Sequence, residues 1–415
     1  MTEPAKKKRP ALGIDWYPQT LPPDTQILTV PLRTADGAAV MGTLYTRGKP
    51  RNAACLMHPR EYFGAHYLVP SLLDCGLAVW TQGARSVGND LRLEHEQAVV
   101  DAAAGIDFLK QRNFEKIVLV GNSGGSGVYS YYIQQSMLEP CKRLLKSPVG
   151  KPTGFENLAM PSVDGMVYLA PHPGQGRLLM GCIDPSVVDE HDALSVDPAL
   201  DPFNPDNGYV AEPGKSRYTP DFIARYRKAQ CARVERLDET ARQLIERRQS
   251  ARRKVKAGGT ERALRLQAAH TPIITVWRTD ADLRCLDLSL DPSERHPGSI
   301  WGNDPLVSNY GAVGFGRLCS PESWLSTWSG VSSQAALEKT APSVSVPTLL
   351  VEYAGDQTTF PLQVQEIFSW IGSSDKHHVR VRGDHHGRPL SGGEVPGRLL
   401  AAQEITSWLA SRDFA

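Results

Sequence analysis

The sequence predicts an α/β fold, with a mostly parallel central sheet, helices on both faces, and a large, mainly helical cap insertion. Short apolar runs typical of buried strands alternate with stretches of helical periodicity in the first and last parts of the chain. Polar and glycine-rich residues directly follow several of these runs, as expected at the carboxyl edge of a parallel sheet. The alternation stops near residue 171 and resumes near residue 346, which predicts an insertion within one core.

The first part of the core, residues 25–170, follows a flexible lead of residues 1–24. It opens with two strands separated by a turn, which are typical of an antiparallel hairpin. Strands and helices then alternate as far as residue 170. The predicted strands are 26–32, 39–45, 53–57, 77–81, 117–120 and 165–169, and the predicted helices are 67–73, 94–111 and one that follows residue 123.

One long helix dominates the predicted cap insertion, residues 171–345. Thr219 and Pro220 form a helix start, with threonine as the N-cap and proline at the first helical position. The helical pattern over 219–256 corresponds to about 55 Å at ~1.5 Å per residue. Its many basic residues indicate either a solvated face or an arm used in homodimerisation.

The rest of the insertion carries weaker signals. Residues 273–277 are typical of a strand. The aromatic residues between 285 and 330 predict either a small satellite core or the lining of an apolar substrate pocket, with Trp324 as a candidate for the second role. The second part of the core, residues 346–415, resumes the alternation. Its predicted strands are 348–353 and 378–381, and its predicted helices are 360–371 and 399–409.

The composition is that of an ordinary globular protein. The chain has 415 residues, of which 41% are hydrophobic and 22% are charged, with a formal net charge of +1. This balance gives no support for nucleic-acid binding. No apolar run approaches the ~18 residues that span a bilayer. We expect a small-molecule substrate, and neither a nucleic-acid nor a membrane partner.

The cysteines and the N-terminal segment indicate a cytoplasmic protein. Seven cysteines are scattered without CxxC spacing, which predicts a reducing compartment and neither a disulfide framework nor a zinc site. The basic N-terminal segment is not followed by the apolar stretch of a secretory signal. The acidic loop region from about 170 to 215 lacks the calcium-loop pattern. We therefore expect no metal and no cofactor.

Ser123 lies in the motif Gly121-Asn122-Ser123-Gly124-Gly125, directly after the apolar run 117–120. This spacing fits the G-x-S-x-G nucleophile elbow. A serine on a sharp strand-to-helix turn has strained backbone, so the positions two before and two after it must be nearly free of side chain. The alternative interpretation is a glycine-rich turn without a catalytic role.

Asp356 and His385 also follow predicted strands, so that the chain carries Ser, Asp and His in the order of the α/β hydrolases. On these residues the chain resembles an α/β-hydrolase-fold serine hydrolase of the esterase/lipase-like superfamily, over residues 25–170 and 346–415. The resemblance implies a catalytic triad in which Ser123 is the nucleophile, His385 its base and Asp356 the acid that orients the base. His386 stays open as the alternative base.

The resemblance also implies an oxyanion hole of two backbone N–H donors. One is Gly124, the residue after the nucleophile. The other belongs to the loop after the third strand, where proline at 59 has no N–H, so that Arg60 or Glu61 remains and Arg60 is favoured. The candidates for substrate binding are His58, Glu61, Arg85, His172 and Trp324.

The predicted function is a serine hydrolase that cleaves a carboxylic ester, lactone or thioester of a small apolar or aromatic substrate through an acyl-enzyme. A C–C bond hydrolase of the aromatic-degradation type uses the same triad and stays open. A catalytically inactive, hydrolase-like binding protein is the non-enzymatic alternative. Haloalkane dehalogenases and epoxide hydrolases are disfavoured, because they use aspartate where Ser123 stands.

Overall fold

The core of the molecule is one eight-stranded sheet with the strand order β1-β2-β4-β3-β5-β6-β9-β10. The computed structural model describes residues 20–211, 214–302, 304–312 and 314–415, so that most of the predicted flexible lead lies outside the described residues. The first pairings, β1 with β2 and β2 with β4, are antiparallel, and all later pairings are parallel. The strands are β1 Gln26–Arg33, β2 Ala39–Thr46, β3 Ala53–His58, β4 Ala78–Gly83, β5 Ile117–Asn122, β6 Gly165–Leu169, β9 Thr348–Tyr353 and β10 Lys376–Val381.

Helices cover both faces of this sheet, as predicted. Every residue of β3, β4, β5, β6 and β9 is buried, which explains why these strands are rich in apolar residues and show no regular alternation with polar ones. The core helices are α1 Val69–Asp74, α2 His95–Gln111, α3 Gly124–Ser136, α11 Pro361–Trp370 and α12 Gly397–Ala410, with short 3-10 helices η1 Asp90–Arg92, η2 Pro140–Lys142 and η3 Phe155–Asn157.

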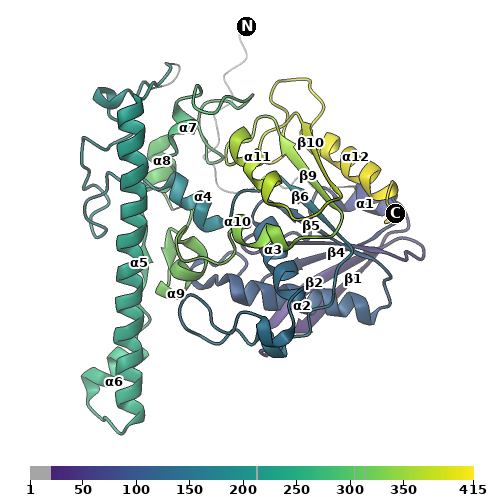
Figure 1. Cartoon of the computed structure of the whole chain (residues 1–415), viewed down its shortest axis with the longest axis horizontal. Coiled ribbons are helices and arrows are strands. Elements are labelled where there is room, and N and C mark those ends of the chain that lie inside the picture. The colour runs from purple at the N-terminus through teal and green to yellow at the C-terminus, as the bar shows by residue number, and fades with distance from the viewer. Residues whose placement is uncertain (1–19, 212–213, 303, 313) are drawn as a thin grey trace.

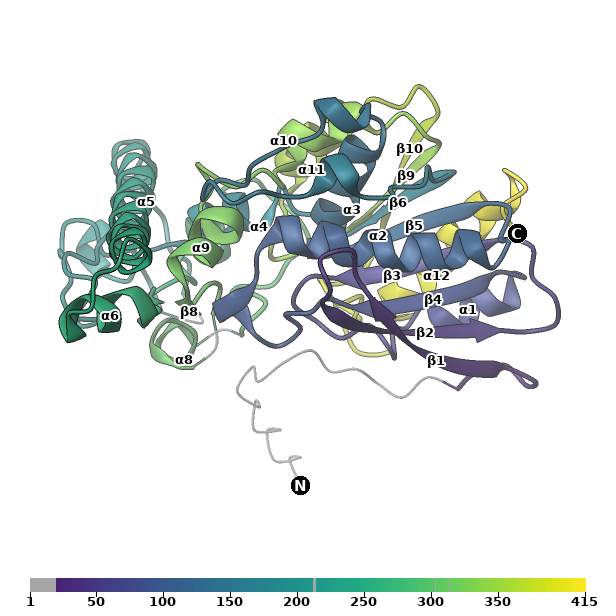
Figure 2. The same ribbon diagram turned by 90° about the horizontal axis from the view of Figure 1, so that it is seen from below.

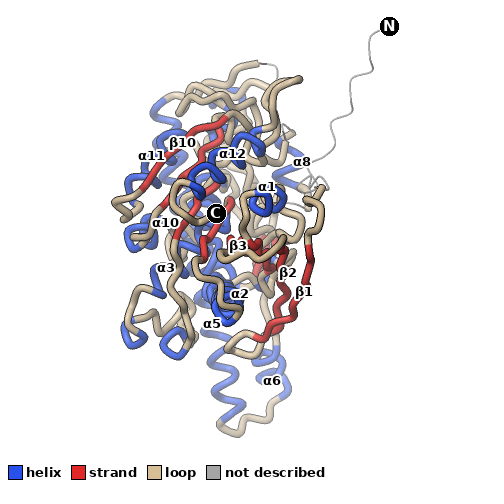
Figure 3. Tube along the Cα trace, turned by 90° about the vertical axis from the view of Figure 1, so that its right-hand side faces the viewer, coloured by secondary structure: helices blue, strands red, loops and turns tan. Residues whose placement is uncertain are grey.

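Successive residues of β3 point to opposite faces, and each face has its own hydrophobic core. Cys55 and Met57 pack with residues of α2, α3 and α11, whereas Ala54 and Leu56 pack with residues of α1 and α12. Figure 3 shows the two groups of helices on either side of the twisted sheet. Helices packed on both faces of the sheet therefore hold the parallel strands in place.

A long insertion separates β6 from β9. Its elements are α4 Gln175–Cys182, η4 Pro205–Asn207, α5 Pro220–Lys256, α6 Arg262–Ala269, β7 Ile274–Thr275, α7 Leu283–Leu286, α8 Pro305–Tyr310, β8 Leu318–Cys319, α9 Pro321–Ser323, η5 Trp324–Trp328, α10 Leu337–Thr340 and η6 Ala341–Ser343. The strand predicted over 273–277 is shorter in the structure, where β7 pairs with β8 in a separate two-stranded sheet.

Helix α5 has 37 residues and begins as predicted, with the Thr219 hydroxyl accepting a hydrogen bond from the N–H of Phe222. It stands along one side of the molecule, and its C-terminal part extends beyond the core together with α6 (Figures 1 and 2). Its buried side, which includes Val234 and Leu237, packs on the hydrophobic core of the insertion. None of the helices in the described ranges has both the length and the apolar composition that crossing a bilayer requires.

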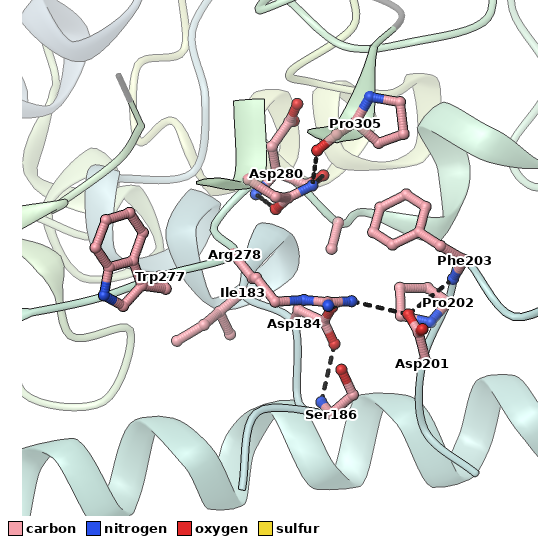
Figure 4. A network of polar contacts seen from close by, with 12 residues as sticks. Ile183, Asp184, Ser186, Asp201, Pro202, Phe203, Trp277, Arg278, Asp280 and Pro305 are labelled. Atoms are coloured by element: carbon pink, nitrogen blue, oxygen red, sulfur yellow. Dashed lines mark hydrogen bonds and ion pairs between the residues drawn. The ribbon is translucent and has the colours of Figure 1, made fainter. Parts of the chain in front are cut away.

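A buried arginine fastens the loops of the insertion to one another (Figure 4). The guanidinium of Arg278 lies 2.6 Å from an Asp184 oxygen and 2.8 Å from an Asp201 oxygen, and it also donates to the Tyr310 hydroxyl. Arg278 has a φ of 55°, in the left-handed region that a side chain rarely adopts. Since a buried charge is tolerated only when it is paired, the two carboxylates hold this strained residue in place.

Candidate active site

Ser123 lies on a sharp turn between β5 and α3, with φ 53° and ψ −122°. Such backbone is strained for any residue other than glycine. A Cβ atom at Gly121 would lie 2.6 Å from Cα of Ser126, and one at Gly125 would lie 2.2 Å from the carbonyl oxygen of Met57. The motif therefore needs glycine at both positions, for the steric reason that its spacing predicts.

The structure brings Ser123, His385 and Asp356 into one hydrogen-bonded chain. Ser123 Oγ lies 3.0 Å from His385 Nε2, and His385 Nδ1 lies 2.9 Å from Asp356 Oδ2. Asp356 follows β9 and His385 follows β10, so both reach the serine from the carboxyl edge of the sheet. Both side chains are buried, whereas Ser123 is partly exposed. A serine hydroxyl, an imidazole and a carboxylate thus meet at hydrogen-bonding distance, which is the geometry that nucleophilic catalysis requires.

Thr358 is a member of this site that the sequence reasoning missed. Its N–H and its hydroxyl donate to Asp356 Oδ1 at 2.7 and 2.8 Å, and its Oγ1 also lies 2.8 Å from His385 Nδ1. The signal was present in the sequence, because a side-chain oxygen of Asp commonly accepts from the backbone two residues on. Thr358 leaves the carboxylate little freedom to rotate away from the imidazole.

The electrostatics favour a charged Asp356 and a basic His385. Burial alone would raise the pKa of the Asp356 carboxyl, but the charge of His385 and hydrogen bonds from His385 and Thr358 outweigh it and lower this pKa. Burial alone would lower the pKa of His385, yet the neighbouring Asp356 charge outweighs that effect and raises it. A more basic imidazole takes a proton from a hydroxyl more readily.

The structure selects His385 over His386 as the partner of Ser123. The two rings meet edge to face, with centroids 5.2 Å apart. Burial, and then the charge of His385, lower the pKa of His386 to about 3. The hydrogen bonds to Ser123 Oγ and Asp356 Oδ2 both come from His385.

The loop after β3 differs from the expectation for the oxyanion hole. The backbone N–H groups of Arg60 and Glu61 donate to Nδ1 of His58, at 3.1 and 3.0 Å. Both amides are thus already engaged, which corrects the prediction that Arg60 supplies the second backbone donor. Gly124 is the first residue of α3, and the first amides of a helix have no partner within it, so its N–H stays a candidate oxyanion donor.

The side chain of Arg60 connects this loop to the insertion. Its guanidinium donates to both carboxylate oxygens of Asp90, at 2.8 and 2.7 Å. It also lies over the rings of Trp328 and Phe315, at 5.0 and 5.6 Å from their centroids. Burial raises the pKa of the neighbouring Glu61 carboxyl. Aromatic residues of the insertion therefore lie next to the loop that follows β3.

Two of the predicted substrate-binding residues have other partners. The Arg85 guanidinium pairs with the buried Asp101 at 2.6 Å and also with Asp36, which ties the turn after β1 to α2. Trp324 is fully buried in the core of the insertion, where its ring N–H donates to Asp238 of α5 at 2.8 Å. These partners correct the expectation that either side chain is available to a substrate.

His172 lies near enough to His385 and Asp356 to interact with their charges. Its Nδ1 accepts a hydrogen bond from the N–H of Gly174 at 3.2 Å. Burial, and then the charge of His385, lower the pKa of His172 to about 3, so its imidazole is neutral. Within the part of the chain that the structure describes, no group of His, Cys, Asp and Glu side chains is arranged to hold a metal ion.

Solved structures match the chain over most of its length at low sequence identity. DcsB, solved in complex with its substrate analogue, matches with a TM-score of 0.50 and 14% identity, over 93% of this chain and 99% of that one. An esterase of Pyrococcus furiosus matches with a TM-score of 0.47 and 12% identity, over 97% and 96%. The esterase domain of a Rhodothermus marinus protein matches with a TM-score of 0.42 and 11% identity, over 93% and 99%.

No protein-family model matches the chain, and no curated protein does. The likeness to DcsB bears on the fold. Together with the strand order it identifies the α/β-hydrolase fold, which carries a helical insertion between β6 and β9.

Proposed function

We propose that this protein is a serine hydrolase that cleaves a carboxylic ester, lactone or thioester through an acyl-enzyme on Ser123. The observation that carries the proposal is the chain of contacts from Ser123 Oγ to His385 Nε2 and from His385 Nδ1 to Asp356, at 3.0 and 2.9 Å. The strained turn at Ser123 supports it, because strain of this kind gathers at reacting groups.

In the first half of the proposed reaction, Ser123 Oγ attacks the acyl carbon while its proton moves to His385 Nε2. The pair of electrons of the carbonyl double bond moves to the oxygen, which faces the N–H of Gly124. When the carbonyl re-forms, the bond to the leaving oxygen or sulfur breaks, and the leaving group takes the proton from His385. Asp356 stabilises the imidazolium throughout and keeps its own charge.

In the second half, water replaces the serine as nucleophile. His385 takes a proton from the water, the hydroxide adds to the acyl carbon, and the proton returns to Ser123 Oγ as the acid leaves. The serine and the histidine are then restored. We further propose a small apolar or aromatic substrate, which is supported by the aromatic residues that the insertion carries between 285 and 330.

A fluorophosphonate probe tests the nucleophile. We expect one adduct per chain, mapped to Ser123 by peptide mass spectrometry, and no adduct on Ser123→Ala. Failure of the folded protein to react would favour the inactive binding protein. A substrate panel of p-nitrophenyl esters, lactones, thioesters and a vinylogous diketone then tests the bond that is cleaved. Turnover of the diketone alone would identify a C–C bond hydrolase.

Two expectations about assembly and location also stay proposals. A homodimer through α5 is supported by the length of this helix and by its extension beyond the core together with α6. Sedimentation that gives the mass of one chain at all concentrations would exclude it. A cytoplasmic location is supported by the scattered spacing of the cysteines.

A further inference from the structure

The first three residues of the loop that follows β3, all of which the structure describes, offer no unengaged backbone N–H. Pro59 lacks an N–H, and the next two amides, those of Arg60 and Glu61, both donate to His58 Nδ1. Yet the developing charge of a tetrahedral intermediate needs more than one fixed donor. The imidazole that accepts these two N–H groups lies beside Gly124, the residue after Ser123.

The two N–H groups determine which nitrogen of His58 carries the proton. A ring nitrogen that accepts hydrogen bonds has no hydrogen, so the proton of the neutral imidazole is on Nε2. The ring is neutral because burial, followed by the charge of Arg60, lowers the pKa of His58 well below its ordinary value. His58 therefore presents an N–H from Nε2 and donates nothing from Nδ1.

Nε2 of His58 is directed toward Gly124. A Cβ atom on Gly124 would lie 2.7 Å from Nε2, closer than to Cε1 or Cδ2, which would be 3.3 and 3.4 Å away. The hydrogen bonds of His58 to other described residues are the two at Nδ1. Thus Nε2–H has no protein acceptor among the described residues, and it lies next to the residue whose amide is the first donor.

The ring is held firmly in this orientation. His58 is only 5% exposed, and its ring packs against Phe63 with centroids 5.3 Å apart. His66 in the same loop offers a contrast: its Nδ1 also accepts a backbone N–H, from Leu68, but its Nε2 contacts Asn122 Oδ1 at 3.2 Å. Of these two imidazoles, His58 is the one whose Nε2 is left for a ligand.

We propose that His58 is the second oxyanion donor of this enzyme, acting through the Nε2–H of its side chain. The proposal rests on the proposed function, because the oxyanion forms on the acyl group that Ser123 attacks. As the Ser123 Oγ–carbon bond forms, the carbonyl oxygen gains negative charge and accepts hydrogen bonds from Gly124 N–H and His58 Nε2–H. Neither proton is transferred, and both bonds weaken again when the carbonyl re-forms.

Two substitutions of His58 separate this role from support of the loop. In His58→Asn, an amide oxygen near the position of Nδ1 still accepts from Arg60 and Glu61, but nothing replaces Nε2. In His58→Gln, the amide N–H₂ reaches the position of Nε2. We expect kcat for the best ester to fall about 10²–10³-fold in His58→Asn with little change in KM, and His58→Gln to recover part of the loss.

A trifluoromethyl ketone built on the acyl chain of that ester isolates the oxyanion. It adds to Ser123 as a charged tetrahedral adduct, whereas the corresponding secondary alcohol binds without reacting. We expect His58→Asn to lose affinity for the ketone by about the same factor as kcat, and affinity for the alcohol much less. His66→Asn is the matched control in the same loop and should show no selective loss for the ketone.

If His58→Asn does not fold, Gly124→Ala provides a second test of the oxyanion role of His58. It keeps the amide of residue 124 but places a methyl group 2.7 Å from His58 Nε2, and should likewise weaken the ketone selectively. The proposal is overturned if His58→Asn is as active as wild type or more active than His58→Gln. It is also overturned if Gly124→Ala binds the ketone and the alcohol with the selectivity of the wild type. If wild type neither reacts with the fluorophosphonate nor cleaves an ester, the proposed function itself fails.

Discussion

The hydroxyl oxygen of Thr358 lies 2.8 Å from Nδ1 of His385, the same nitrogen that lies 2.9 Å from Asp356. Because that hydroxyl also donates to the other oxygen of Asp356, Asp356 and His385 share Thr358 as a third partner. Thr358 contacts Asp356 and His385, and it would act on the reaction only through them. We therefore regard Thr358 as a positioning residue.

Thr358→Val removes this hydroxyl and keeps the shape of the side chain. Loss of a hydrogen bond to a charged group is worth about 1.5–3 kcal/mol. We therefore expect kcat/KM to fall by roughly ten-fold or more, with unchanged labelling stoichiometry by the fluorophosphonate. Thr359→Val is the matched control, since the Thr359 hydroxyl is buried without a hydrogen-bond partner among the described residues. Equal rates for the two variants would show that the Thr358 hydroxyl is dispensable.

The pH–rate profile reports the raised pKa of His385. In the proposed mechanism, His385 must be neutral to accept the proton of Ser123, so we expect activity to be lost as pH falls through the pKa of His385 in the folded protein. We expect this acid limb above the ordinary histidine value of 6.5, because the charge of Asp356 outweighs burial.

Asp356→Asn removes that charge, and should shift the acid limb to lower pH and reduce kcat by about 10⁴-fold. Stopped assays of initial rate between pH 5 and 9 measure both effects. A limb that stays in place in Asp356→Asn would mean that another group titrates.

Ser123 stores backbone strain that glycine would release. Both Ser123→Ala and Ser123→Gly should abolish turnover, because each lacks the nucleophile. Only glycine adopts the φ of 53° without a side-chain clash, so we expect Ser123→Gly to be more stable than wild type by about 1 kcal/mol. Ser123→Ala should keep the melting temperature of the wild type. Denaturant unfolding of the three proteins makes the comparison, and a glycine variant less stable than the alanine variant would contradict it.

Glu96 of α2 is a buried carboxyl at the contact between core and insertion. It accepts hydrogen bonds from Ser326 Oγ at 2.5 Å and from Tyr131 at 3.4 Å, and burial raises its pKa to about 7. Between its ordinary value of 4.5 and about 7, the folded state holds a proton that the unfolded state releases. The Glu96 contribution to stability is therefore full at low pH and declines through this interval, by about 3 kcal/mol in total.

Glu96→Gln should remove this pH-dependent loss while keeping the hydrogen bonds. We expect its free energy of unfolding to exceed that of wild type at pH 8 and to approach it at pH 5. Guanidinium melts at the two pH values measure the difference. The same difference at both values would show that Glu96 does not change its protonation on unfolding.

Arg85→Ala tests whether Arg85 has a structural or a binding role. The substitution leaves Asp101, which is fully buried, without its cation. Breaking such a pair costs about 3–5 kcal/mol, so we expect a large loss of stability. The KM of the folded fraction should stay unchanged, because Arg85 contacts Asp36 and Asp101 rather than the triad. A rise in KM at constant stability would restore the original expectation of substrate binding.

The sequence predicted the central strands closely because their burial on both faces leaves continuous apolar runs. Thr348–Tyr353 has the predicted bounds, and the start of α5 was evident from Thr219 and Pro220. Ser123 and Asp356 each follow such a run, whereas His385 follows the edge strand β10, which is polar and partly exposed. Whether a residue follows a strand depends on the residues next to it in the chain, so the local sequence pattern predicts it.

The misassigned residues depend on contacts between distant segments. Arg85 finds Asp36 and Asp101, and Trp324 finds Asp238, through packing that no local pattern encodes. The amides of Arg60 and Glu61 turn toward His58 because the loop folds back on its own imidazole. Proline at 59 shows from the sequence alone that this position has no N–H. The direction in which the N–H groups of Arg60 and Glu61 point depends on how the loop folds.

The separation of 262 positions between Ser123 and His385 has a consequence for the order in which the protein matures. A ribosome makes the chain from the N-terminus, so Ser123 and the whole insertion emerge before Asp356 and His385. Strand β6 can pair with β9 only after the whole insertion between them has been synthesised. The contacts between Ser123, His385 and Asp356 therefore form only when the last two strands join the sheet.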